Sequence, residues 1–139
     1  MKIIGYRIGN GYYVRPTITC SVPLIFNTVS FRIDTGCDIT TLSLNDALNI
    51  KLDFRTLEEP FDVLGGSGKI RTYSLFNCGL SFDMGNCILF EKMNILHVSL
   101  PNVTPDNADL IRNIPSLLGI DFIQRYNMKY DDYYVYLER

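Results

Sequence analysis

The sequence predicts a mainly β domain of many short strands, closed into a barrel or packed as a sandwich. Hydrophobic residues make up 47% of the 139 positions and charged residues 20%, so the chain can bury a core and is not typical of a disordered protein. Nine Tyr and eight Phe favour strands over helices. Short apolar runs alternate with turn residues along the chain, and only two short helices are indicated. We expect a single domain over residues 1–139.

The first part of the chain predicts hairpins followed by one helix. Gly9-Asn10-Gly11 is a turn signal that tolerates positive φ, and Pro16 and Pro23 separate the next extended stretches. Ser43 can cap a helix that has Asp46 in its first turn. The expected strands lie at 2–8, 12–14, 17–22, 24–33 and 39–42, and the helix at 43–50.

The second part of the chain predicts further hairpins and one more helix. A glycine-rich tip over 65–68 joins two strands, and a polar stretch over 101–113 is expected to be a surface excursion. The chain is expected to close as a hairpin around Asp131-Asp132. The expected strands lie at 61–64, 69–76, 80–82, 87–90, 93–100, 114–119, 128–130 and 133–137, and the helix at 121–126.

The charge balance and the hydropathy pattern exclude two classes of partner. Thirteen Lys and Arg against fifteen Asp and Glu give a net charge of −2, which does not fit a nucleic-acid binder. No run approaches the roughly 18–20 apolar residues that cross a bilayer. The first four residues are followed at once by Gly5, Tyr6 and Arg7, which leaves no apolar region of a signal peptide. We therefore expect a cytoplasmic protein without nucleic-acid or membrane partners.

The cysteines and the single histidine do not indicate a metal site. No two cysteines form a C-x-x-C pair, and none lies near the histidine in sequence. Reduced, mostly buried thiols are expected for Cys20, Cys37, Cys78 and Cys87. His97 lies in an apolar stretch and is interpreted as structural. We expect no metal and no organic cofactor.

The strongest chemical signal is an apolar strand that delivers Asp34-Thr35-Gly36 into a turn. An Asp at the end of a buried strand is partly desolvated, and a Gly two residues later lets another backbone come close. The Thr35 hydroxyl can donate to a neighbouring backbone. These residues suit a rigid carboxylate that is approached by an extended chain, although the tripeptide alone also fits an ordinary turn.

In three places the chain resembles the retropepsin-like aspartic proteases, the single-domain relatives of pepsin. Residues 31–43 look like the active-site loop of that family, 63–68 like its glycine-rich flap tip, and 117–126 like its apolar-apolar-glycine strand and C-terminal helix. The closing residues 127–138 resemble the last hairpin of non-viral members. The resemblance covers most of 31–138 and implies a closed, pepsin-like barrel with a flap hairpin.

The resemblance also implies roles for single residues. Asp34 would be the catalytic carboxylate, Thr35 would brace the loop against a partner's loop, and Gly36 would present its carbonyl to the substrate. Asp38 would hold the substrate main chain. The residues that would line the cleft or close over the substrate are Leu64, Gly65, Gly66, Ser67 and Gly68.

The resemblance implies that the active-site loop would rest on Leu118 and Gly119. Two other positions depart from the family pattern. Ile120 follows, where viral relatives have an Arg paired to the Asp that Asp38 matches, so the anchoring of Asp38 is open. Cys37 stands where Ala or Ser is usual and fits by size.

The chemistry implied by the resemblance requires two chains. Hydrolysis of peptides by carboxylates alone needs two of them close together sharing one proton, one acting as general base and the other as general acid. This chain has one such loop and is too short for a two-lobed enzyme. We therefore expect a homodimer that meets about a twofold axis at Asp34, activates water, and cleaves extended peptides bound in the interface cleft.

Other interpretations stay open. The same motifs fit a catalytically inactive retropepsin-like module that dimerises or binds peptide, which Ile120 favours, and a chance tripeptide on an unrelated small β-barrel. A phosphate loop at the glycine-rich tip is disfavoured because Val63 and Ile70 stand where its motif needs Gly and Ser or Thr. Cys37 and His97 lack any local signature of a thiol protease.

Overall fold

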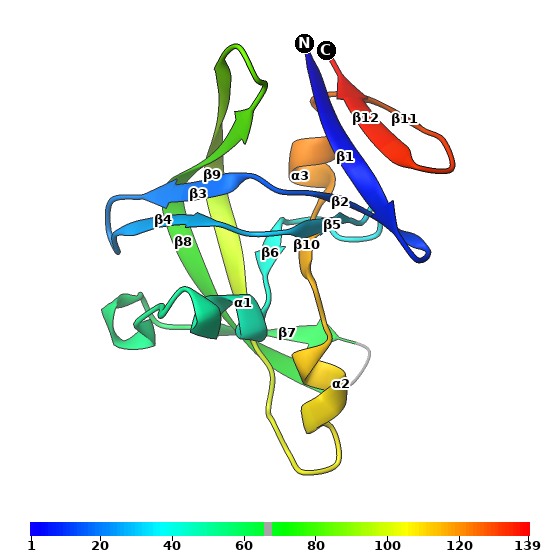
Figure 1. The fold of residues 1–139 in the computed structure, drawn as a ribbon. Coiled ribbons are helices and arrows are strands. Elements are labelled where there is room, and N and C mark those ends of the chain that lie inside the picture. Colours follow the sequence, from blue (N-terminus) through cyan, green and yellow to red (C-terminus); the bar gives the residue numbers. More distant parts are fainter. Residues whose placement is uncertain (66–67) are drawn as a thin grey trace.

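The structure is a computed structural model that describes residues 1–65 and 68–139, and it is mainly β (Figure 1). The strands are β1 (Lys2–Ile8), β2 (Gly11–Val14), β3 (Thr17–Cys20), β4 (Ile25–Thr28), β5 (Phe31–Ile33), β6 (Thr41–Leu42), β7 (Phe61–Gly65), β8 (Gly68–Asp83), β9 (Ile88–Leu100), β10 (Ser116–Leu118), β11 (Asn127–Tyr130) and β12 (Tyr134–Glu138). The helices are α1 (Leu44–Asn49), the 3-10 turn η1 (Phe54–Thr56), α2 (Ala108–Arg112) and α3 (Ile120–Ile123). In the described residues, no helix is long and apolar enough to cross a membrane.

Hydrogen bonds join the described strands into one strongly curved sheet. Its order is β11-β12-β1-β2-β5-β10-β6-β9-β8-β3-β4, with β7 paired to β8 beside this path. The expectation of a mainly β chain is confirmed. The ladder runs from a free edge at β11 to a free edge at β4, so hydrogen bonds between the described strands do not close the sheet into a barrel.

The centre of the sheet explains how a turn after β5 is held in place. β5 runs parallel to β10, and β6 lies antiparallel to β10 on its other side. The chain therefore leaves β5, makes the loop of residues 34–40, and returns as β6 with β10 clamped between the two strands. β6 in turn lies parallel to β9. Because β5 and β6 pair with opposite edges of β10, the loop of residues 34–40 is held at both of its ends.

Two strands are longer than the sequence predicts. β8 and β9 each continue through the points where separate strands were expected, and they pair from Arg71–Leu100 to Asp83–Ile88. Conversely, the stretch expected over 24–33 is divided, because the chain bends between β4 and β5. The predicted hairpin over 61–76 is present as the β7–β8 pair.

The helices follow local signals only in part. Ser43 caps α1 as predicted, since its hydroxyl oxygen accepts a hydrogen bond from the Asp46 backbone N–H at 3.2 Å. Helix α3 starts at Ile120 and ends earlier than the sequence predicts. The surface excursion over 101–113 contains the short helix α2, which the sequence reading missed because its polar flanks mask the apolar Ile111.

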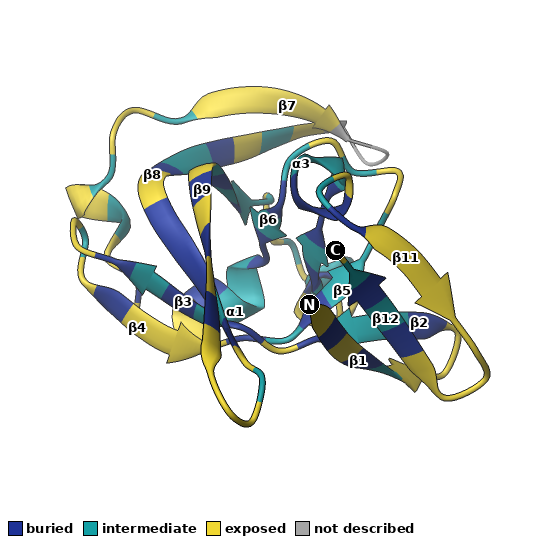
Figure 2. Cartoon of the chain, turned by 90° about the horizontal axis from the view of Figure 1, so that it is seen from above, coloured by how far each residue is buried: buried dark blue, intermediate teal, exposed yellow. Residues whose placement is uncertain are grey.

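The core lies on one face of the curved sheet. Its fully buried side chains come from β2, β3, β5, β6, β8, β9, β10, β12 and α3. The ring of Phe122 in α3 packs against those of Phe82 and Tyr126, with ring centroids 5.6 and 5.3 Å apart. Figure 2 shows buried residues along the central strands, whereas β7 and β11 are exposed. The largest fully buried side chains are Phe31, Phe122, Ile18, Leu42, Leu75, Leu80, Met93, Leu96, Leu118 and Leu137.

Candidate active site

The Asp34 loop folds tightly on itself at the end of β5. The Gly36 N–H donates to Asp34 Oδ1 at 2.9 Å, and the Cys37 N–H donates to the Asp34 carbonyl at 3.2 Å. The Asp34 N–H donates to the Leu118 carbonyl at 3.0 Å, which continues the pairing of β5 with β10. Asp34 is half-buried, and Thr35 and Gly36 are exposed. The carboxyl group is thus fixed while one side of the loop faces solvent.

The first turn of α3 holds the far side of the loop through its backbone. The Ile120 N–H donates to the Cys37 carbonyl at 2.8 Å, and the Asp121 N–H donates to the Asp38 carbonyl at 3.2 Å. Backbone N–H groups at a helix start have no partner within the helix, so the loop carbonyls satisfy them. The main chain of Asp38 is therefore anchored without an Arg at position 120, and its side chain remains exposed.

The buried Thr40 and the half-buried Asp121 link the loop to α3. Asp121 Oδ1 accepts from the Thr40 hydroxyl at 2.7 Å and from the Thr40 N–H at 3.0 Å. The same hydroxyl oxygen accepts from the Gly119 N–H at 3.0 Å. Thr40 is completely buried. The sequence reading missed this link, although a buried Thr after the loop and an acidic residue after Gly119 were its available signals.

Gly119 has no room for a side chain. A Cβ built there would lie 2.7 Å from the Cys37 carbonyl oxygen and 3.0 Å from backbone atoms of Ile39 and Thr40. Gly119 therefore packs directly against the backbone of residues 37–40. Close approach of two backbones, and not a left-handed φ, is what requires glycine here.

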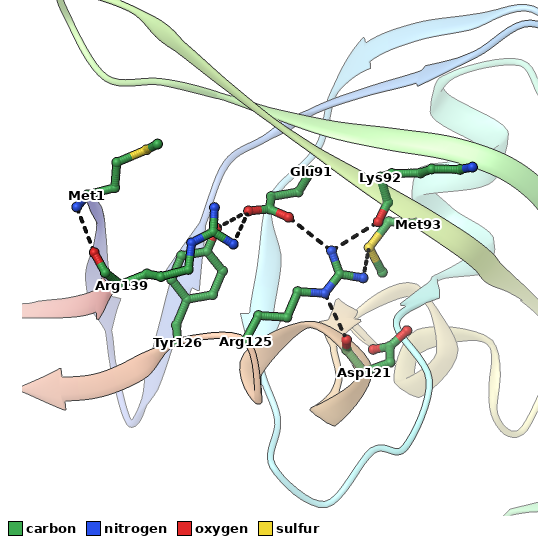
Figure 3. A network of polar contacts seen from close by, with 8 residues as sticks. All are labelled: Met1, Glu91, Lys92, Met93, Asp121, Arg125, Tyr126 and Arg139. Carbon is green, nitrogen blue, oxygen red and sulfur yellow. Dashed lines mark hydrogen bonds and ion pairs between the residues drawn. The ribbon is translucent and has the colours of Figure 1, made fainter.

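A second polar network connects the residues that follow α3 to β9 and to Arg139 (Figure 3). Arg125 donates to Glu91 Oε2 at 3.0 Å and to the Lys92 carbonyl at 2.9 Å. Arg139 lies 2.9 Å from the other Glu91 oxygen, and the Tyr126 hydroxyl also donates to Glu91. Burial raises the pKa of Glu91, but these hydrogen bonds and the two Arg charges outweigh it and set the pKa below its usual value. The network ties α3 to β9 and to the end of β12.

An open cavity of about 590 Å³ lies against the Asp34 loop. Asp34 and Thr35 form one wall, and residues of β2, β5, β10, β11 and β12 form the rest. Its other lining residues are Tyr12, Arg32, Ile33, Pro115, Leu117, Met128, Tyr130 and Val135. The sequence reading had not assigned Arg32 to the site, although the alternation of β5 puts residues 32 and 34 on one side of the chain.

The predicted glycine-rich tip belongs to the β7–β8 hairpin. Leu64 is 82% exposed and pairs with Lys69, and Gly65 pairs with Gly68. Gly66 and Ser67, also predicted to bind substrate, lie outside the described residues. Because Gly68 opens a second strand and not a helix, this hairpin lacks the context of a phosphate loop.

The thiols and the histidine do not form a second catalytic pair. The Cys37 thiol donates to the Ile39 carbonyl at 3.0 Å, and burial raises its pKa. His97 is half-buried with its ring centroid 5.3 Å from that of Phe61, and burial lowers its pKa against the opposing charge of Asp121. A raised thiol pKa disfavours a nucleophilic thiolate. Among the described residues, no cluster of His, Cys, Asp or Glu has the arrangement of a metal site.

Comparison with solved structures identifies the fold. A retropepsin-like aspartic protease from Rickettsia conorii superposes with a TM-score of 0.61 at 21% identity, covering 99% of this chain and 98% of that one. EIAV protease in complex with an inhibitor superposes with a TM-score of 0.52 at 15% identity, covering 86% of this chain and 91% of that one. No family model matches the sequence, and no curated protein matches it.

The chain therefore has the retropepsin-like fold over essentially its whole length. The resemblance inferred from the three sequence motifs is confirmed at the level of the fold. At these identities the similarity defines the architecture, and the chemistry has to be argued from the residues of this chain.

Proposed function

We propose that this chain is an aspartic endopeptidase in which two copies of Asp34, one from each subunit of a homodimer, activate a water molecule. The observation that carries the proposal is the Asp34 loop, which is fixed at both ends by β10 and α3 and opens onto a cavity. The retropepsin-like fold supports a peptidase of the aspartic type. The roles of Thr35, Gly36 and Asp38 are part of the same proposal.

The chemistry makes the second subunit necessary. Two carboxylates about 3 Å apart cannot both be ionised, so they share a proton and divide the roles of general base and general acid. One activates water for attack on the peptide carbonyl, and the other donates its proton to the carbonyl oxygen. A single copy of Asp34 can supply only one of these roles.

The free edge of β11 supports a contact surface for the second copy on this side of the molecule. All four residues of β11 are exposed, and Met128 and Tyr130 line the cavity that contains Asp34. An exposed sheet edge has unpaired backbone groups that favour pairing with another strand. A twofold contact near this edge would bring the two Asp34 loops together.

The β7–β8 hairpin completes the proposal as a flap. Its exposed Leu64 and the paired Gly65 and Gly68 are placed at a tip that would close over an extended peptide. The peptide would bind through main-chain hydrogen bonds with alternate side chains in pockets.

The test is a digest of a peptide library by the wild type and by Asp34→Asn. We expect cleavage by the wild type and a loss of at least about 10²–10⁴-fold in the variant, whose far-ultraviolet circular dichroism should not change. Cleavage at full rate by the variant would refute the assigned chemistry. Binding of peptides without any cleavage by the wild type would instead identify the inactive binding module.

A dilution series tests the homodimer separately. Specific activity should fall as the protein is diluted below the dimer dissociation constant, because each monomer holds half of the site. Sedimentation at the same concentrations gives the oligomeric state. Activity that stays proportional to protein in a solution of monomers would contradict the shared site.

A further inference from the structure

A row of half-buried residues crosses the centre of the sheet in register. Each member pairs with the next across neighbouring strands, from β2 through β5, β10, β6 and β9 to β8. Residues paired in this way point to the same face of a sheet. The members of this floor row are Tyr13, Arg32, Leu117, Thr41, His97 and Ser74.

The floor row lies on the face of the sheet that looks away from the core. Each of its members is half-buried, whereas the neighbours that point the other way are buried in the core. Those buried neighbours are Val14, Phe31, Leu118, Leu42 and Val98. Arg32 and Leu117 of the row share the cavity with Asp34. The part of the row at Arg32 and Leu117 is therefore the floor on which a substrate near Asp34 would lie.

Arg32 carries the positive charge of this floor. It sits two residues before Asp34, and its Nε would be 2.9 Å from a Cβ built on Gly11, so the glycine makes room for the side chain. The ion pairs within the described residues do not involve Arg32. Within the floor row, Arg32 carries the charge, because burial lowers the pKa of His97 and favours its neutral form, and the row has no acidic member.

A guanidinium in a closing cleft needs an anion. When a second subunit and a substrate cover the cavity, Arg32 loses water, while Asp34 in the same cavity wall is engaged with the attacking water in the proposed mechanism. A further anion from the substrate would then lower the cost of burying the guanidinium. A carboxylate is its best partner, since guanidinium groups bind carboxylates through two parallel hydrogen bonds. Apolar residues of the same lining, including Pro115 and Leu117, would hold the aliphatic part of such a side chain.

We propose that Arg32 is a specificity-determining residue that selects substrates with an Asp or Glu side chain close to the scissile bond. The inference rests on the proposed peptidase function and adds the substrate class. It predicts discrimination between a carboxylate and an amide of the same shape, because only the carboxylate neutralises the guanidinium.

The experiment compares quenched fluorescent peptides that differ only in Glu against Gln at one position, chosen from cleavage sites found in a library digest. We expect the wild type to cleave the Glu peptide with a kcat/KM about ten-fold or more above that of the Gln peptide. Arg32→Met should bring the ratio near one. Arg32→Lys should restore part of it, which a structural role of the side chain would not do.

A matched control is Arg15→Met, which removes an exposed arginine that does not line the Asp34 cavity. It should leave the Glu-to-Gln ratio unchanged. Cleavage by the wild type without a preference for Glu or Asp, or a preference that survives Arg32→Met, would overturn the role of Arg32 while leaving the peptidase function intact.

A binding measurement separates this inference from the proposed activity. Dye-labelled Glu and Gln peptides are titrated with Asp34→Asn protein, with and without Arg32→Met. Tighter binding of the Glu peptide that depends on Arg32 supports the acidic specificity even if the wild type cleaves nothing, in which case the peptidase proposal fails alone. Equal binding of both peptides, or no binding, overturns the inference.

Discussion

Replacing Thr40 by Val should destabilise the protein severely although the two side chains have nearly the same shape. The Thr40 hydroxyl donates to Asp121 at 2.7 Å and accepts from the Gly119 N–H at 3.0 Å, and the residue is completely buried. Val keeps the packing and removes both hydrogen bonds. The buried Gly119 N–H is then left without a partner.

The magnitude follows from these two contacts. An unsatisfied buried donor costs about 1–3 kcal/mol, and a lost hydrogen bond to a carboxylate costs about 1.5–3 kcal/mol. The free energy of unfolding should therefore fall by about 2.5–6 kcal/mol. With a urea m-value of about 1–3 kcal/mol/M, the midpoint of unfolding should fall by about 1 M or more.

The assay is urea unfolding followed by far-ultraviolet circular dichroism, with all proteins at one concentration because the proposed dimer couples stability to concentration. Thr40→Ser is the matched control, since it keeps the hydroxyl and loses one methyl group worth about 0.8 kcal/mol. If Thr40→Val is as stable as Thr40→Ser, the hydroxyl does not link the loop to α3 and the reasoning is refuted.

Three further outcomes are expected. Gly119→Ala should lower the free energy of unfolding by about 1–3 kcal/mol, because the new methyl group meets backbone atoms. Gly79→Ala should cost less, because its methyl group meets an exposed aromatic ring that can turn aside. Thermal melts compare the two variants, and equal losses of stability would contradict this distinction. Glu91→Gln should cost about 2–3 kcal/mol at pH 7. Because folding lowers the pKa of Glu91, this loss of stability is fully present above the unfolded pKa of 4.5 and should shrink as the pH falls through the folded pKa. Urea titrations of both proteins at pH 7 and at lower pH measure the difference in the free energy of unfolding. A difference that does not change with pH would disprove the prediction. In the native protein a maleimide reagent should label the exposed Cys87 well before Cys78, because burial raises the pKa of the Cys78 thiol. Mass spectrometry of digests shows the order in which the two thiols are labelled. Labelling of Cys78 first would show that β8 opens.

The loop around Asp38 is anchored although position 120 is Ile and not Arg. The family resemblance left the anchoring of Asp38 open because no Arg is present at that position. The backbone N–H groups of Ile120 and Asp121 hold the loop carbonyls, so the anchor is made by the main chain of α3. The side chain at position 120 is thereby free to be apolar.

Local signals in the sequence determined the parts of the molecule that depend on a few neighbouring residues. The turn at Asp34, the Ser43 cap of α1 and the hairpin around the glycine-rich tip each follow from residue types with restricted backbone preferences. The order of three short motifs was enough to predict the fold, because each motif marks a strand end that this architecture needs.

Only the tertiary structure decided which distant residues meet. Thr40 touches Asp121, and Arg32 lies in one row with Thr41 and His97, because β10 is inserted between β5 and β6. Pairing between strands that are far apart in sequence depends on the sheet as a whole and leaves no local mark. The sequence therefore indicated the Asp34 loop, and the sheet register showed that Arg32 lies in the same cavity as that loop.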